Sequence, residues 1–335
     1  MTDAIRTPPD GGDTMQIATR AMACEWSIVL NPGRHERVME VGDILELIHE
    51  TESWLSVYRP NSQLSRINQN AAHGPVVTRR EVFEVLQLAA SLHQLTDGGF
   101  DLTAGSLIQL WRNCRREKRI PTEEEVAETL LKVNMSAVCL TETAHTVEFT
   151  APGISLDPGA IGKGYALDSA AKWLLKKGAD FQEFLVHGGH SSLIARGRHN
   201  GHDGWPVGIG NPLLTKSRLA TVLLKDQAMS TSGSNIQFFR HGGRRYGHIL
   251  DPKTGWPAEG MLSVTVFASS AAVADALSTA FFVLGVEKAA QCCDNLQDTG
   301  VILIPFPQAG KRVSPTVIGV PPERIFWDEE QVAFS

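Results

Sequence analysis

The chain has 335 residues, of which 42% are apolar and 20% are charged, and its formal net charge is -6 at pH 7. This composition is typical of a globular protein with a large core, and the length allows one large domain or two ordinary ones. The negative charge offers no basic surface for nucleic acid or anionic lipid, so we expect neither as a partner. The five cysteines show no Cys-x-x-Cys or Cys/His ligand spacing, so we expect reduced thiols and no structural zinc.

Residues 1–14 are polar and contain Pro and Gly, so they are expected to form a disordered tail. They include no apolar signal region and no lipid-attachment cysteine behind one, and no other segment is apolar for long enough to span a bilayer. As written, the sequence therefore predicts a cytoplasmic protein without a membrane anchor.

The first half of the chain is expected to be mostly helical. Apolar side chains recur at helical spacing in several segments, and Asp97-Gly98-Gly99 is a helix stop. The expected elements are a β-like stretch at 15–30, helices at 36–51 and 79–95, an ordered restart at 100–111, a Pro-led helix within 117–133, a short strand near 147–150 and a helix at 165–177.

The second half is expected to consist mainly of strands, separated by turns that contain Gly, Pro and Asn. Strand-like runs occupy 184–197, 205–212, 218–226, 246–251, 262–269 and 300–306, with helices at about 271–284 and 286–296 before the last of them. The pattern predicts the α+β class, with helices packed on antiparallel or mixed strands. We expect one domain at 15–325, between the tails 1–14 and 326–335.

The segment Ser155–Asp168, "SLDPGAIGKGYALD", is a candidate for ligand binding. Gly159, Gly162 and Gly164 allow the backbone to approach a ligand closely, and the following helix directs its first amides at the loop, as phosphate sites do. The spacing matches neither GxxxxGK[ST] nor GxGxxG. A plain strand–turn–helix connection with Lys163 in solvent is the alternative, and the pattern leaves both open.

The apolar helix at 271–284 contains an acidic residue. Asp275 and Thr279 are four residues apart and therefore share a face, with Ser278 beside them. A carboxylate in a buried helix has to be paired, hydrogen-bonded or bound to a cation, and oxygen ligands of this kind suit Mg²⁺. The alternative is an aspartate that only caps the start of the helix.

The stretch Met229–Gly255 combines hydroxyl side chains with basic residues. The Ser/Thr/Gly loop expected at 230–234 offers hydroxyls and amides for phosphates or a heterocycle, and Arg244-Arg245 adds positive charge. His248 is two residues after Tyr246, so in a strand both side chains share one face. A histidine there suits proton transfer near neutral pH, and a purely structural histidine is the alternative.

These segments together resemble the ApbE family, the FAD:protein FMN transferases. The likeness covers roughly Ile17 to Phe306. The matching stretches, in order, are MAC (22–24), ESWLSVYRPNSQLSRIN (52–68), GGFDLTAGSLIQLW (98–111), LDPGAIGKGYALD (156–168), FLVHGGHSSLIARG, WPVGIGNP, STSG…YGHILDPKTG and SVTV…ADALSTAFFVLG.

The resemblance implies a T-fold-like α+β architecture and an enzyme that uses FAD and Mg²⁺. Family members move the FMN half of FAD onto a Ser or Thr hydroxyl of a target flavoprotein and release AMP, and some relatives hydrolyse FAD to FMN and AMP instead. Many are exported lipoproteins, whereas this sequence shows no such leader. A non-catalytic FAD-binding protein is a third possibility, but such a protein needs neither Asp275 nor His248.

The resemblance also assigns roles to single residues. His248 matches the family's proton-handling histidine, and we take His248 and Asp251 as the catalytic candidates. The metal motif falls on the Ala160 carbonyl, Asp275, Ser278 and Thr279. The expected FAD contacts are Met22, Ser56, Tyr58, Asp101, Leu102, Thr103, Asp157, Lys163, Thr231, Ser232, Ile249 and Leu250.

From these assignments we expect the hydroxyl-rich loop and the His248–Asp251 strand to form one wall of a dinucleotide pocket, opposite the metal helix. The chain departs from the usual family pattern at several positions. Ala23-Cys24 stands where Gly-Thr is usual, Pro158 replaces a leucine and Gly162 an alanine. Ser278 stands where some members have a second acid, which implies a lower affinity for the metal.

Overall fold

The computed structural model describes residues 14–31, 38–178, 181–214, 216–234, 238–307, 312–328 and 330–332. Within them the helices are α1 Val38–Leu55, α2 Gln63–Asn70, α3 Arg80–Leu95, α4 Gly105–Arg116, α5 Glu123–Leu130, α6 Gly162–Lys176 and α7 Ala271–Cys293. The strands are β1 Met15–Ala21, β2 Cys24–Leu30, β3 Val76–Val77, β4 Val138–Thr141, β5 Thr146–Phe149, β6 Phe184–Gly188, β7 Ser192–Arg196, β8 Trp205–Gly210, β9 Arg218–Leu224, β10 Gln227–Gly233, β11 Phe238–His241, β12 Arg244–Gly247, β13 Met261–Ala268, β14 Gly300–Pro305, β15 Thr316–Ile318 and β16 Ile325–Trp327.

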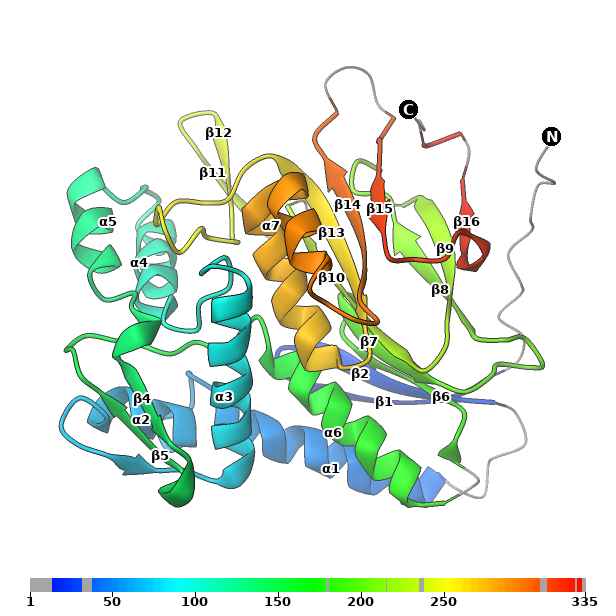
Figure 1. Cartoon of the computed structure of the whole chain (residues 1–335), viewed down its shortest axis with the longest axis horizontal. Coiled ribbons are helices and arrows are strands. Elements are labelled where there is room, and N and C mark those ends of the chain that lie inside the picture. Colours follow the sequence, from blue (N-terminus) through cyan, green and yellow to red (C-terminus); the bar gives the residue numbers. More distant parts are fainter. Residues whose placement is uncertain are drawn as a thin grey trace.

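An eight-stranded sheet runs through the middle of the molecule, in the order β1-β2-β6-β7-β10-β13-β14-β15 (Figure 1). All of its neighbouring strands are antiparallel. Helices α1, α6 and α7 pack on one face of this sheet, and the small sheet β16-β9-β8 packs on the other. Because both faces are covered, every residue of β13 is buried. This arrangement confirms the α+β class.

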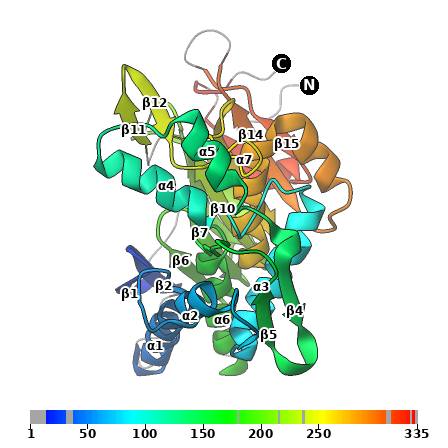
Figure 2. The same cartoon turned by 90° about the vertical axis from the view of Figure 1, so that its left-hand side faces the viewer.

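Two smaller units flank the central layers. Helices α2 and α3 accompany the short sheet β3-β5-β4, and α4 and α5 lie beside the hairpin formed by β11 and β12 (Figure 2). An aromatic cluster fastens the hairpin to α4: the Trp111 ring lies 5.8 Å from the Tyr246 ring and 6.1 Å from the Phe239 ring. The hairpin leads directly into the segment that contains His248, so its packing fixes where that segment begins.

Several predicted elements differ from the observed ones in position or kind. The stretch at 15–30 is a hairpin of two strands, and α6 begins at Gly162, three residues earlier than predicted. The two helices predicted at about 271–284 and 286–296 correspond to the two halves of α7, which are separated by a kink with non-helical backbone at Gly285 (φ 76°, ψ -178°). Glycine adopts that conformation without steric cost, and the break predicted near this residue is therefore confirmed.

Two further differences concern the candidate site. The loop predicted at 230–234 is largely strand β10, and the strand predicted at 246–251 ends at Gly247, before His248. At the C-terminus, β16 pairs with β9 through Trp327, beyond the domain boundary expected at 325. The tail expected at 1–14 falls outside the described residues except for Thr14.

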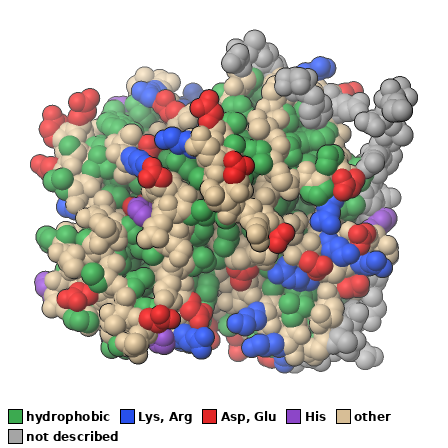
Figure 3. Space-filling model, viewed as in Figure 1, with side chains coloured by type: hydrophobic (Ala, Val, Ile, Leu, Met, Phe, Trp, Pro, Cys, Tyr) green, Lys and Arg blue, Asp and Glu red, His purple; other side chains and the backbone are tan. Residues whose placement is uncertain are grey.

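The surface and the cysteines agree with the composition. On the face shown in Figure 3, acidic and basic side chains are interspersed. All five cysteines are free thiols. Among the helices of the described segments, none has the length and apolarity needed to cross a membrane.

Candidate functional site

The close crossing of α6 and α7 sets the geometry of the site. A Cβ atom at Gly164 would lie 2.2 Å from the Ala271 carbonyl oxygen, so only glycine fits at this point. One turn further along α6, the Asp168 carboxylate accepts hydrogen bonds from Ser270 Oγ (2.6 Å) and from the backbone amides of Ala271 (2.7 Å) and Ala272 (3.0 Å). Burial raises the pKa of Asp168, and these donors oppose that rise. The first turn of α7 is thereby held against α6.

Asp275 follows on α7 and is only 4% exposed. Its Oδ1 atom accepts from Ser192 Oγ (3.1 Å) and Ser230 Oγ (3.0 Å) and lies 3.5 Å from Lys163 Nζ. Its Oδ2 atom accepts from the Gly164 amide at 3.3 Å.

The capping alternative for Asp275 is excluded, because another residue caps α7. The Ser270 side chain occupies the N-cap and accepts from the Val273 amide. The Asp275 carboxylate is instead a buried anion between α7, the glycine loop and strands β7 and β10. Its nearest charged partner is Lys163, which the sequence left open as either a ligand contact or a solvated side chain.

Strand β10 brings further hydroxyls to the same place. Ser232 Oγ lies 2.9 Å from Ser278 Oγ and 3.2 Å from Thr279 Oγ1. Ser278 Oγ also donates to the Asp275 carbonyl at 2.9 Å. The hydroxyl-rich segment and α7 are therefore in direct contact, and they are not opposite walls of a pocket as predicted.

Thr231 is separated from this cluster. Side chains alternate between the two faces of a strand, so Ser230 and Ser232 point to α7 and Thr231 points to the other face. There its Oγ1 atom lies 2.9 Å from Thr265 Oγ1 on β13. In the loop predicted at 230–234, side chains would not alternate between two faces, so the prediction placed Thr231 and Ser232 in the same site.

The oxygen atoms around Asp275 fit a hard divalent cation. They comprise one buried carboxylate and the hydroxyls of Ser278 and Thr279 on the same helix, and the glycine loop that carries Ala160 reaches Asp275 through Lys163 and the Gly164 amide. The Gly164 amide, at the end of the glycine loop, donates to Asp275 Oδ2. Among the described residues, no group of three or more His, Cys, Asp or Glu side chains is placed so that it could hold a metal ion. This donor set suits Mg²⁺, which takes its remaining ligands from water or phosphate.

The predicted FAD contacts Asp101, Leu102, Thr103 and Asp157 form a connected unit. Asp101 Oδ1 accepts from the Thr103 amide (2.7 Å) and from Thr103 Oγ1 (2.5 Å). The Leu102 carbonyl accepts from the Asp157 amide at 2.9 Å, and Asp157 Oδ1 accepts from the Gly159 amide at 2.8 Å. Burial raises the pKa of Asp157. This unit is thus joined to the glycine loop that carries Ala160 and Lys163.

The predicted contacts near the N-terminus belong to two turns. Met22 has a left-handed backbone (φ 49°), and its amide donates to Glu52 Oε1 at 2.8 Å. Cys24 in the same turn lies within electrostatic reach of Asp275: burial raises its pKa, and the positive charge of Lys163 opposes the rise. The turn is therefore close to the Asp275 cluster.

Ser56 and Tyr58 follow α1. Ser56 Oγ accepts from the Tyr58 amide at 3.2 Å. The Tyr58 side chain is exposed, and its hydroxyl accepts from Arg112 Nη2 at 2.6 Å. The Arg112 guanidinium also lies 4.9 Å from the centre of the Tyr58 ring. Tyr58 thus presents an exposed aromatic ring, against which the Arg112 guanidinium of α4 lies.

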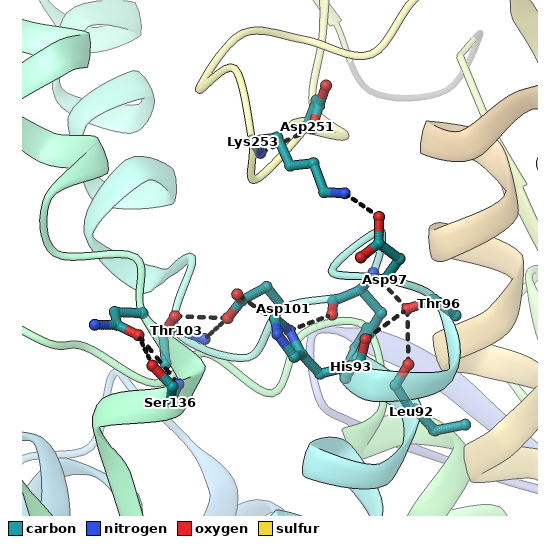
Figure 4. A network of polar contacts seen from close by, with 11 residues as sticks. Leu92, His93, Thr96, Asp97, Asp101, Thr103, Ser136, Asp251 and Lys253 are labelled. Carbon is teal, nitrogen blue, oxygen red and sulfur yellow. Dashed lines mark hydrogen bonds and ion pairs between the residues drawn. The ribbon is translucent and has the colours of Figure 1, made fainter.

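The segment from His248 to Asp251 follows β12. Ile249 and Leu250 are buried, whereas the Asp251 carboxylate accepts from the Lys253 amide at 2.8 Å within its own turn. Lys253 Nζ lies 2.6 Å from Asp97 Oδ2, which joins this turn to the loop before Asp101 (Figure 4). The structure therefore brings two distant segments of the predicted site together, and it shows a turn-forming role for Asp251.

Sequence reasoning missed several residues of the site. Ser230 belongs to the hydroxyl-rich segment at 230–234 that was predicted to bind a ligand, but its contact with Asp275 was not predicted. The contacts of Ser192 and Asp168 gave no signal, because their partners are 83 and 103 residues away in the sequence. His93, which contacts Asp101, was taken only as part of an amphipathic helix.

The amino-acid sequence and the structure of the chain are both similar to those of known proteins. The sequence model of the ApbE family matches residues 22–303. The chain is 30% identical over 264 residues to the FAD:protein FMN transferase of Klebsiella pneumoniae (strain 342), covering 78% of this chain and 80% of that protein. The crystal structure of the ApbE protein of Thermotoga maritima superposes with a TM-score of 0.79 at 29% identity, over 88% of this chain and 94% of that one. The flavin transferase ApbE of Vibrio cholerae gives a TM-score of 0.79 at 26% identity, over 91% and 97% of the two chains.

Proposed function

Because the chain belongs to the ApbE family, we propose that it transfers the FMN moiety of FAD to a Ser or Thr hydroxyl of a target flavoprotein and releases AMP. The family and the ApbE-like fold expected from the sequence are confirmed. The observation that carries the proposal is the buried Asp275 carboxylate, held beside Lys163, the glycine loop and the hydroxyls of β10 and α7. A protein that only bound FAD would have no use for that arrangement.

Two regions would hold FAD. The Asp101–Thr103 unit and the glycine loop offer backbone and carboxylate groups, and Tyr58 offers an aromatic face for stacking. Lys163 adds a positive charge for the diphosphate. The proposed contacts are Met22, Ser56, Tyr58, Asp101, Leu102, Thr103, Asp157, Lys163, Ser232, Ile249 and Leu250, without Thr231, which faces the other layer.

The metal ligands would be the Asp275 carboxylate, the hydroxyls of Ser278 and Thr279 and the Ala160 carbonyl. When bound there, Mg²⁺ supplies positive charge that stabilises the charge developing on the diphosphate in the transition state. The rigid contact between α6 and α7 keeps these oxygens in place before the substrate arrives, so the binding energy is not used to assemble them.

The transfer itself exchanges one P–O bond for another. The acceptor hydroxyl oxygen bonds to the phosphorus of the FMN half, and the bond from that phosphorus to the bridging oxygen breaks, so that AMP leaves. His248 would take the proton of the acceptor hydroxyl as it attacks, a role that contributes about 10²–10⁴-fold in rate. Asp251 holds the turn that follows His248, which fixes the end of this segment.

One assay tests the proposal directly. The purified protein is incubated with FAD and Mg²⁺, with and without an acceptor flavoprotein domain, while AMP and covalently bound flavin are measured. AMP that appears only with the acceptor, together with covalent flavin, supports transfer. AMP without acceptor indicates hydrolysis of FAD, and the absence of AMP in both samples rules the transferase out.

Two variants test the roles of single residues. Asp275→Asn removes the buried charge, and we expect turnover to fall about 10³-fold because the metal is lost. His248→Ala is expected to bind FAD normally and to lose about 10²–10⁴-fold in rate. Asp203→Asn and His73→Gln, both at exposed positions, are the matched controls. Full activity of Asp275→Asn in metal-limited buffer would contradict the metal assignment.

A further inference from the structure

His93 lies at the end of α3, directly behind the Asp101–Thr103 unit (Figure 4). Its Nδ1 atom is 3.1 Å from the Phe100 carbonyl oxygen and 3.2 Å from Asp101 Oδ2. Both of these atoms are acceptors, so Nδ1 carries a proton whether the ring is neutral or charged. The second proton is therefore gained or lost at Nε2.

The Asp101 carboxylate is almost fully enclosed, with 6% of its side chain exposed. Oδ1 is occupied by its own chain neighbour Thr103, whereas Oδ2 is reached by His93 from another element. The loop between them is closed by hydrogen bonds from Thr96 Oγ1 to the Leu92 carbonyl (2.7 Å) and from the Phe100 amide to Thr96 Oγ1 (3.1 Å). A short, closed loop of this kind leaves His93 and Asp101 little freedom to separate.

Charged groups face His93 from three directions. Asp97 and Asp101 lie on the adjoining loop. Lys253 lies in the turn that follows the His248–Asp251 segment. Gly98, in the loop after α3, lies between the side chains of His93 and Lys253: a Cβ atom on Gly98 would be 3.5 Å from His93 Cε1 and 3.4 Å from Lys253 Cε. From α7, Lys288 lies within electrostatic reach of Asp97, and the Cys292 thiol donates to the Leu95 carbonyl. The hydrogen bond to Asp101 raises the pKa of His93, and burial opposes this rise.

We propose that His93 is a positioning residue of the flavin site, and that its second proton makes the binding of FAD depend on pH. This inference rests on the proposed function, because it takes Asp101–Thr103 as part of the FAD site. With the ring protonated, the His93–Asp101 pair is neutral overall. With the ring neutral, the pair carries one negative charge, which repels the negatively charged diphosphate of FAD.

The size of the effect follows from the charge and its surroundings. One unit charge at a partly buried site acts on the ligand through an intermediate dielectric and is screened by salt beyond about 10 Å. We therefore expect the affinity for FAD to fall about threefold to tenfold as the pH rises through the titration of His93. The hydrogen bond from Nδ1 persists in both states, so Asp101 keeps its orientation throughout.

Binding of FAD itself, followed by its fluorescence between about pH 5.5 and 8.5 at constant ionic strength, provides the test. In His93→Gln the amide group can still donate to Asp101 but cannot titrate, so the affinity should be independent of pH in this range. In His93→Leu the buried carboxylate loses a donor, and the affinity should fall about tenfold at every pH. His73→Gln, an exposed histidine, should retain the wild-type profile, and unfolding curves of all variants separate binding from stability.

The outcomes distinguish this inference from the proposed function. A His93→Gln profile with the slope of the wild type would overturn the role of His93, even if FAD binding and turnover are otherwise as proposed. Unchanged affinity in His93→Leu would do the same for the positioning role. A wild-type protein that fails to bind FAD at any pH would overturn both proposals.

Discussion

The contact between α6 and α7 at Gly164 makes the most direct prediction of the structure. In Gly164→Ala the new Cβ atom would lie 2.2 Å from the Ala271 carbonyl oxygen and 2.5 Å from Ala272 Cα. Ordinary contact begins at 3.4 Å, so the helices would have to separate by about 3.4 - 2.2 = 1.2 Å. The neighbouring atoms are backbone, and they cannot move aside without moving α7.

Such overpacking costs about 1–3 kcal/mol by itself. The same displacement stretches the hydrogen bonds from Ser270 and Ala271 to Asp168 and from Gly164 to Asp275. We therefore expect the free energy of unfolding to fall by about 3 kcal/mol, near the upper end of that range. Turnover of FAD should fall more than tenfold, since Asp275 would no longer lie at the glycine loop.

Urea unfolding followed by circular dichroism measures the first effect, and release of AMP measures the second. The matched control is Gly42→Ala in α1, where nothing lies within 4 Å of the new Cβ atom. Alanine in the interior of a helix is favoured over glycine, so this variant should gain about 0.5–1 kcal/mol. If Gly164→Ala unfolds at the same urea concentration as the wild type, the close crossing of α6 and α7 does not exist.

Further predictions concern other contacts. Asp168→Ala removes three hydrogen bonds to the start of α7 and should cost about 1–2 kcal/mol in urea unfolding, while a cost near zero would show that Ser270 alone caps the helix. Because the pKa of His93 is raised on folding, its charged form stabilises the fold fully below 6.5, and the unfolding free energy should fall as the pH rises through the higher folded pKa; His93→Gln should abolish this slope. Trp111→Phe loses the 2.8 Å hydrogen bond to the Gly255 carbonyl and should lower the unfolding free energy by about 1 kcal/mol, and an unchanged value would refute that contribution.

The elements with strong local periodicity were predictable from the sequence, and the contacts that build the site were only partly so. The apolar spacing in α3 and the Pro-led start of α5 depend on neighbours within a few residues, and both helices were placed to within a few residues or better. The break between the two halves of α7 was also predictable, because Gly285 adopts a positive φ that other residues rarely adopt.

Within the site, the chemical character of Asp275 was predictable because a carboxylate in an apolar helix needs a partner wherever it is buried. Its actual partners were not, since Ser192 and Gly164 are brought to it by the fold alone. The role of Thr231 depended on whether its segment was a loop or a strand, and glycine and serine content favoured the loop. Pairing of β10 with β7 and β13 on both sides overrode that preference.

The position of β10 in the sheet affects which parts of the enzyme can accept amino-acid substitutions. Ser230 and Ser232 lie on an inner strand, four strands from the β1 edge and three from the β15 edge, and they touch a buried helix. Backbone amides in such a place open only when much of the domain opens, so they should exchange hydrogen with water slowly. Tyr58 and the β11–β12 hairpin lie at the periphery instead. Substitutions at the periphery can thus accumulate while the buried cluster around Asp275 stays unchanged.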